Sequence, residues 1–180
     1  MNHQNFNSLA RNCFVAMIFT TVPITAKAAP APEASINSRE AFDKIKGLAG
    51  QWQGTEGEKG KGPPIPIAYK VTASGSVVME TMFPGSDHEM ITLYHMDGDK
   101  LTLTHYCSLR NQPVMALTGK STSNDLVFDF AGGTNIKPKH DMHMHALRIR
   151  LDGKDSIATE WDLFQEGKLV DTKKFFFSRK

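Results

Sequence analysis

Between residues 50 and 178 the chain is a series of short segments in which apolar and polar residues alternate. Alternation of this kind indicates β-strands that turn one face to a core, because successive side chains along a strand point to opposite faces. Residue pairs typical of tight turns, such as Ser74-Gly75 and Asp97-Gly98, separate many of the segments. We predict ten strands, at residues 50–56, 67–73, 77–83, 90–96, 100–109, 114–121, 125–131, 145–151, 156–165 and 169–178.

The connections are short enough for each predicted strand to pair with the next one along the chain. Such a meander leaves two unpaired edges unless it closes on itself, and an up-and-down barrel removes both edges. Helical periodicity is confined to residues 37–48, where Asn37 or Ser38 can cap the first turn. The predicted fold class is therefore all-β, a ten-stranded antiparallel up-and-down barrel with a short N-terminal helix.

The first 28 residues have the organisation of an export signal. A polar segment with a single Arg11 precedes an apolar run of about a dozen residues, and Ala26-Lys27-Ala28 supplies the small residues that signal peptidase accepts. The apolar run is shorter than the ~20 residues that a membrane-spanning helix needs. We expect no membrane span, cleavage after Ala28, and export to the periplasm of a Gram-negative cell or otherwise secretion. The remaining chain would have a disordered leader at residues 29–36 and one barrel domain at residues 37–180.

Cleavage would leave a chain of balanced charge. Removal of Arg11 and Lys27 lowers Lys plus Arg from 21 to 19, which equals the 19 Asp plus Glu. Because there is neither a net positive charge nor a basic stripe, nucleic acid is not expected as a partner. Cys107 would be the one remaining thiol, so we expect no disulfide within the chain and a thiol that is buried or liganded. The sequence does not indicate an oligomeric state.

Gly50-Gln51-Trp52 comes directly after the expected helix. This order resembles the calycins, the lipocalin and fatty-acid-binding-protein group of ligand-holding barrels, and the resemblance implies that the Trp closes one end of the barrel. From about Phe42 to the C-terminus the chain also resembles a family of uncharacterised bacterial exported proteins, a domain of unknown function with a calycin-like barrel. The motifs that carry this resemblance are Thr104-His-Tyr-Cys107, Asn111-Gln-Pro113 with Met115, His143-Met-His145 and Glu160-Trp161. It implies a fold and an exported location, but no activity.

The haem-binding nitrobindins also begin their barrel with a Gly-x-Trp-x-Gly stretch, which is similar to residues 50–54. In that family a His on a late strand holds the haem. No His follows His145 in this sequence, so haem is not expected as a cofactor.

Alternation further predicts which polar side chains face the inside. In the segment 100–109, His105 and Cys107 share a face with Leu103. In the segment 156–165, Trp161 lies on the face of Ile157. These three side chains are therefore expected inside the barrel.

The turns set the register of two hairpins. A two-residue turn at Ser74-Gly75 pairs Tyr69 with Glu80, which places the carboxylate among inward apolar side chains. A two-residue turn at Asp97-Gly98 pairs Tyr94 with Leu101 and turns Tyr94 inward. Because a buried carboxylate must be paired and hydrogen-bonded, we expect histidines to supply the donors to Glu80.

The stretch His140-Asp-Met-His-Met-His145 precedes the eighth predicted strand. Leu147 faces inward there, and counting back by two turns His145 and His143 inward and Met142 and Met144 outward. We expect His140 to stay in a solvated loop.

The sequence thus predicts one interior site, with no catalytic residue assigned, from Tyr69, Glu80, His105, Cys107, His143, His145 and Trp161. Three functions remain open: polar anchors for a small, partly apolar molecule; a Zn-like metal site, structural or hydrolytic, at His105, His143 and His145; and a scaffold with an occluded core. The metal spacing lacks a known signature, so a divalent metal is a possible cofactor only. Of these we favour non-covalent binding of a small molecule, while the hydrolytic alternative leaves enzymatic activity open.

Overall fold

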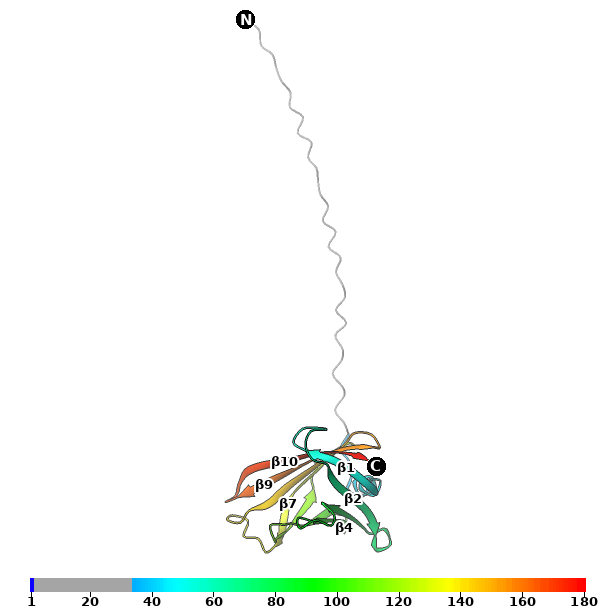
Figure 1. Ribbon diagram of the computed structural model, residues 1–180, viewed down its shortest axis with the longest axis vertical. Coiled ribbons are helices and arrows are strands. Elements are labelled where there is room, and N and C mark those ends of the chain that lie inside the picture. Colours follow the sequence, from blue (N-terminus) through cyan, green and yellow to red (C-terminus); the bar gives the residue numbers. More distant parts are fainter. Residues whose placement is uncertain (2–33) are drawn as a thin grey trace. The chain divides into compact units, whose positions relative to one another are not determined.

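The structure, a computed structural model, describes Met1 and residues 34–180, so the predicted export signal and most of the predicted leader lie outside the described residues. In the described part, ten antiparallel strands form a closed barrel in chain order, and the last strand pairs with the first (Figure 1). Together with one short helix, this barrel confirms the predicted fold class. The strands are β1 (Gly50–Glu56), β2 (Ile65–Thr72), β3 (Val77–Met82), β4 (Met90–Asp97), β5 (Lys100–Tyr106), β6 (Gln112–Leu117), β7 (Asp125–Thr134), β8 (His143–Leu151), β9 (Ser156–Gln165) and β10 (Lys168–Arg179).

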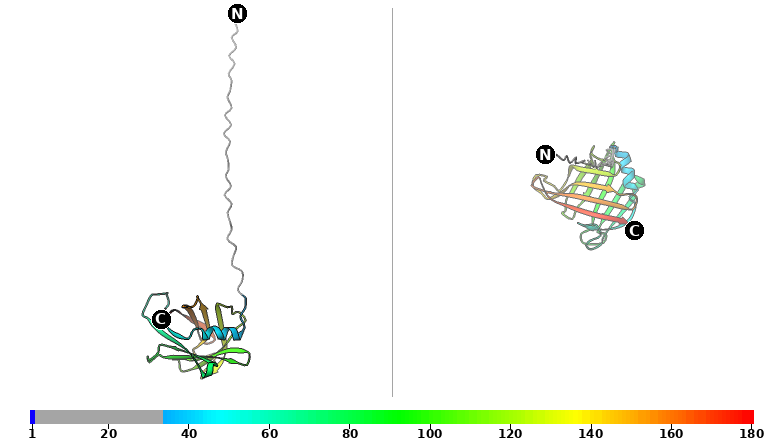
Figure 2. Two further views of the ribbon diagram at one scale, coloured as in Figure 1. Left: turned by 90° about the vertical axis from the view of Figure 1, so that its right-hand side faces the viewer. Right: turned by 90° about the horizontal axis from the view of Figure 1, so that it is seen from above.

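The helix α1 (Ser38–Lys46) packs against the barrel and contacts β2, β4 and β5 (Figure 2). Asn37 caps it as predicted, because its side-chain oxygen accepts a hydrogen bond of 2.9 Å from the Glu40 amide. Just before the cap, the Ile36 amide donates to the Ser121 carbonyl, so the end of the expected leader joins the barrel domain. No helix in the described part of the chain is long and apolar enough to cross a bilayer.

One end of the barrel is closed by Trp52, which is 1% exposed. Its indole N–H donates a hydrogen bond of 2.8 Å to the carbonyl of Leu48, just after α1. The guanidinium of Arg179 lies 4.3 Å from the indole ring and donates to the carbonyls of Gly47 and Ala49 at 3.0 and 2.8 Å. The first strand, the last strand and the end of the helix are therefore joined around this one indole.

Gly54 allows β1 to approach β10 closely. A Cβ atom built at this position would lie 2.0 Å from the carbonyl oxygen of Phe176 and 2.5 Å from the ring of Phe177. Any side chain here would separate the two strands that close the barrel, which explains the second glycine of the Gly-x-Trp-x-Gly stretch.

The β4–β5 hairpin has a different register from the predicted one. Tyr94 lies opposite Leu103 instead of Leu101, and Asp97 pairs with Lys100, so the turn is one residue later than expected. The pairing moves by two residues, and a shift by an even number leaves every side chain on its face. Tyr94 is therefore fully buried, as the sequence predicts.

One hydrophobic cluster runs from α1 through the barrel. It includes Ile45 on α1, Trp52 at the closed end and Trp161 on β9. Its largest fully buried members on the strands include Ile67, Leu101, Leu103, Met115, Leu126, Phe128, Leu147, Ile149 and Phe177. The candidate site described below is built on this hydrophobic core.

Candidate functional site

A cavity of about 260 Å³ opens at the end of the barrel away from Trp52. The two ends can be told apart along β1, because Trp52 lies near its start, whereas Glu56, its last residue, lines the cavity. Most of the lining is apolar. The lining residues are Glu56, Met82, Phe83, Met90, His105, Cys107, Ser108, Leu109, Met144, Trp161, Leu163, Lys173 and Phe175.

His105 is a buried titratable side chain of this lining, and it is 3% exposed. Its Nδ1 lies 2.9 Å from the hydroxyl of Thr92, which is directly opposite on β4, and its ring packs 4.6 Å from the indole of Trp161. Burial lowers the pKa of His105 to about 4, so the imidazole is neutral at neutral pH. Its Nε2 is buried and has no hydrogen-bond partner among the described residues.

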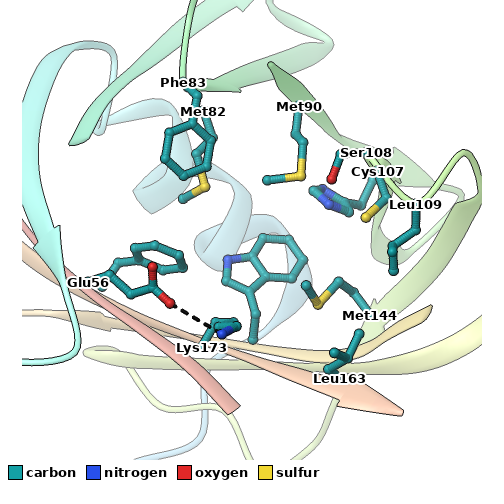
Figure 3. Close-up of a pocket in the computed structure, with 13 residues that line it drawn as sticks. Glu56, Met82, Phe83, Met90, Cys107, Ser108, Leu109, Met144, Leu163 and Lys173 are labelled. Atoms are coloured by element: carbon teal, nitrogen blue, oxygen red, sulfur yellow. Dashed lines mark ion pairs between the residues drawn. The ribbon is translucent and has the colours of Figure 1, made fainter. Parts of the chain in front are cut away.

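Sulfur-containing side chains form much of the remaining wall. Figure 3 shows Met90, Cys107 and Met144 turned toward a common space, with Met82 on the other side of it. Burial raises the pKa of the Cys107 thiol, so it stays protonated at neutral pH and acts as a small apolar group with a weak donor. Thioether side chains are unbranched and adaptable, so this wall can adjust to the shape of a ligand.

The rim of the cavity carries an ion pair. The ammonium of Lys173 lies 3.5 Å from Glu56, drawn as a dashed line in Figure 3, and 2.9 Å from Asp171. Both carboxylates and the ammonium are well exposed, so solvent screens their interactions. The charges at the rim are thus already paired, and the wall behind them is mainly uncharged.

Glu80 belongs to a second, separate cluster in the barrel. It lies opposite Tyr69, as predicted, and accepts a hydrogen bond of 2.6 Å from the hydroxyl of Tyr94. Burial raises the pKa of Glu80 to about 7, against the opposing effect of the two tyrosines. The donor is therefore a tyrosine and not a histidine, which corrects the predicted pairing. Neither Glu80 nor Tyr69 lines the cavity.

The histidines of β8 form a third group because of an irregularity in that strand. A β-bulge between Met144 and Ala146 shifts the register between β8 and β9. Met144 lies opposite Leu163, and both line the cavity. His143 lies opposite Phe164, the next residue of β9, whose side chain points to the other face of the sheet.

The predicted grouping of His143 and His145 with His105 is not found: His143 is fully buried, but neither of the two β8 histidines lines the cavity. Alternation counted back from Leu147 does not hold across a β-bulge, which inserts an extra residue into one strand. Met144, expected outside, lines the cavity in their place.

His143 and His145 instead hydrogen-bond to each other beside two phenylalanines. The Nδ1 of His143 lies 2.8 Å from the Asp141 carbonyl, which can only accept, so this nitrogen carries the proton. Its Nε2 lies 3.0 Å from Nδ1 of His145, within hydrogen-bond distance. The ring of His145 stacks on Phe164 and Phe130, with centroids 3.9 and 5.0 Å apart. Burial and the neighbouring histidine lower the pKa of His145.

The predicted metal site is not assembled. Among residues 34–180, no group of three or more His, Cys, Asp or Glu side chains is placed to hold a metal ion. His105 contacts Thr92 and Trp161, whereas His143 and His145 contact each other. His140 lies in the exposed loop before β8, as predicted.

Of the seven predicted site residues, His105, Cys107 and Trp161 line the cavity. Sequence reasoning missed most of the apolar wall. Alternation on β3 and β10 could have found Met82 and Phe175, which are buried and in step with neighbouring core residues. Ser108 and Leu109 were predicted to continue the strand at residues 100–109, but β5 ends at Tyr106 and both residues lie beyond it.

Comparison with known proteins supports the fold and leaves the function open. No protein-family model matches this chain, and no curated protein matches it. Rv2717c from M. tuberculosis has a similar structure, with a TM-score of 0.50 and 17% sequence identity over 78% of this chain and 97% of that chain. At this identity the likeness extends to the fold alone.

A second similar structure is a protein of unknown function from the DUF3598 family of Nostoc punctiforme. It has a TM-score of 0.49 and 12% identity, over 76% of this chain and 49% of that chain. The present chain thus spans about half the length of that protein. Membership of the calycins stays a prediction.

Proposed function

We propose that this protein binds a small, mainly apolar molecule, without a covalent bond, in the cavity at the open end of the barrel. The observation that carries the proposal is the Nε2 atom of His105, a buried polar atom that lacks a partner among residues 34–180 and belongs to a mainly apolar wall. An unpaired buried polar atom costs ~1–3 kcal/mol, and a ligand that pairs with it recovers part of that free energy. His105 is the polar anchor, and Trp161 and Cys107 belong to the apolar wall.

The size and composition of the cavity support this function. Binding sites for small molecules are mostly apolar concavities of about 300–1,000 Å³ with a few polar groups that orient the ligand. A cavity of about 260 Å³ is slightly smaller, which favours a ligand smaller than a typical drug.

The same features weigh against the two other candidate functions. A scaffold with an occluded core would have apolar side chains filling this end of the barrel, where the cavity opens instead. The metal-site hypothesis required His105, His143 and His145 to converge, and they belong to two separate groups. We also propose export of the protein, on the basis of the signal-like pattern at residues 1–28.

Native mass spectrometry of the full chain, purified from its own host, tests the proposal together with binding of the uncharged fluorescent probe N-phenyl-1-naphthylamine. We expect a small-molecule adduct that is lost on denaturation, and probe fluorescence that is reduced when that adduct is present. Met90→Trp should fill the cavity and abolish both signals. Met79→Trp, on the outward face of neighbouring β3, is the matched control and should leave both unchanged.

Wild-type protein that carries no adduct and also fails to bind the probe would contradict a ligand-binding cavity. Equal loss of binding in Met90→Trp and Met79→Trp would show that the variants act through folding instead of through the cavity. Circular dichroism of each variant separates these two outcomes.

A further inference from the structure

Thr92 and His105 form a buried cross-strand pair, and this pair determines which nitrogen of the ring carries the proton. They lie directly opposite each other on β4 and β5, and they are 1% and 3% exposed. The 2.9 Å contact joins the Thr92 hydroxyl to Nδ1 of His105. Because neither group reaches solvent, each of their protons needs a partner within the protein or in a ligand.

The proton between Thr92 and His105 can be placed in two ways. If the ring nitrogen donates to the hydroxyl, the hydroxyl proton of Thr92 has no acceptor among the described residues, and the other ring nitrogen is unpaired as well. If Thr92 donates to Nδ1, only Nε2 lacks a partner. The second arrangement leaves fewer buried groups unpaired and is therefore the more stable one.

In that arrangement a neutral imidazole has its single N–H at Nε2. The ring is neutral because it is desolvated and has no carboxylate partner in the described part of the chain, and burial lowers its pKa. His105 thus presents a hydrogen-bond donor, and not an acceptor, on the side of the ring away from Thr92. A ligand group that could only donate would bring two N–H or O–H protons against each other.

We propose that the cavity selects uncharged apolar molecules with a carbonyl oxygen, which accepts a hydrogen bond from Nε2–H of His105. This inference rests on the proposed function, since it names the chemical class of its ligand. An anionic acceptor would lose its hydration in an apolar wall, and the ammonium of Lys173 at the rim is already paired with two carboxylates. Nε2 is buried, so part of the wall must move aside as the carbonyl enters, and the flexible thioethers of Met90 and Met144 in the same wall allow such adjustment.

The test uses two probes of nearly equal size, acetophenone and ethylbenzene, which differ in one carbonyl oxygen. Each is titrated into the isotope-labelled full chain while backbone amide shifts are followed by NMR. We expect acetophenone to bind about tenfold more tightly than ethylbenzene, which is the effect of roughly one buried hydrogen bond. Long-range correlation of ring protons with ring nitrogens should show the proton of His105 at Nε2.

His105→Phe removes the donor and keeps a ring of similar size. It should weaken acetophenone by about tenfold and leave ethylbenzene unchanged, because only the hydrogen bond is lost. If this variant unfolds, Thr92→Val combined with His105→Phe removes the unpaired hydroxyl as well and allows the same comparison.

The outcomes separate this inference from the proposed function. Failure of both probes to bind, with no native ligand present, would refute the binding cavity itself. Binding of both probes with equal affinity, or a His105 proton found at Nδ1, would leave the cavity in place and overturn the preference for a carbonyl group.

Discussion

Replacement of Glu80 by glutamine tests whether this buried carboxyl group controls how stability depends on pH. The Glu80→Gln side chain has nearly the same size, and its amide oxygen can still accept from the Tyr94 hydroxyl. Its amide N–H can donate to the Tyr69 hydroxyl, which has no hydrogen-bond partner of normal geometry in the described part of the chain. The variant should therefore keep the barrel and lose one proton-binding group.

The expected magnitude follows from the pKa of Glu80, which burial raises from 4.5 to about 7. The folded state then holds this proton more tightly than the unfolded state does. Stability from this group is complete below pH 4.5 and is lost as the pH rises to about 7. The separation of these two values corresponds to about 3 kcal/mol in the free energy of unfolding.

The lowered pKa of His105 makes stability depend on pH in the opposite direction, over an overlapping range of pH. Burial lowers its pKa from 6.5 to about 4, so its contribution is complete above pH 6.5 and is lost as the pH falls toward 4. The two groups partly compensate in the wild type, and a flat overall profile would not reveal either one. The informative quantity is the difference between wild type and Glu80→Gln at each pH.

Urea denaturation of both proteins across this range measures that difference. We expect the stability of the wild type relative to Glu80→Gln to fall by about 3 kcal/mol between pH 4.5 and 7. Glu166→Gln, at an exposed turn, is the matched control and should show no such dependence. A difference that stays constant with pH would mean that the pKa of Glu80 is the same in the folded and unfolded states, which would refute the reasoning from burial.

Three other predictions concern the closed end and the N-terminus. Trp52→Ala should destabilise the barrel by ~3–5 kcal/mol in the same denaturation assay, as truncation of a large buried aromatic does, and a loss under ~1 kcal/mol would contradict its role in closing the barrel. Gly54→Ala should lower stability by at least the ~1–3 kcal/mol of an overpacked core, because its Cβ meets the carbonyl of Phe176, and thermal unfolding would detect it. N-terminal sequencing should find Ala29 first in protein recovered outside the cytoplasm, and a soluble cytoplasmic form beginning at Met1 would count against export.

The fold could be predicted because alternation and turn residues are local signals, and a small error in strand register does not change the predicted fold. The β4–β5 register was two residues off, yet Tyr94 is on the predicted face because the error was even. The pairing of Tyr69 with Glu80 was predicted correctly from the turn alone.

The candidate site was predicted only in part, because one irregularity changed its membership. The bulge after Met144 moved that side chain into the cavity and took His143 and His145 away from His105. A bulge adds one residue and so shifts the register by an odd number, which moves the side chains beyond it to the opposite face of the sheet. A register error of two residues leaves every side chain on its predicted face. No turn residue or composition signal marks this bulge in the sequence.

The position of Arg179 near the end of the chain also determines when the barrel can form during synthesis. This residue bonds to Gly47 and Ala49, about 130 positions earlier, and its strand is the one that pairs with β1. Until β10 has left the ribosome, β1 and β9 remain open edges, and the indole of Trp52 lacks its cover. The nascent chain therefore cannot complete the barrel one strand at a time as it is synthesised. Closure is a late event of high contact order, and the exposed edges of the incomplete sheet are where a chaperone would be needed.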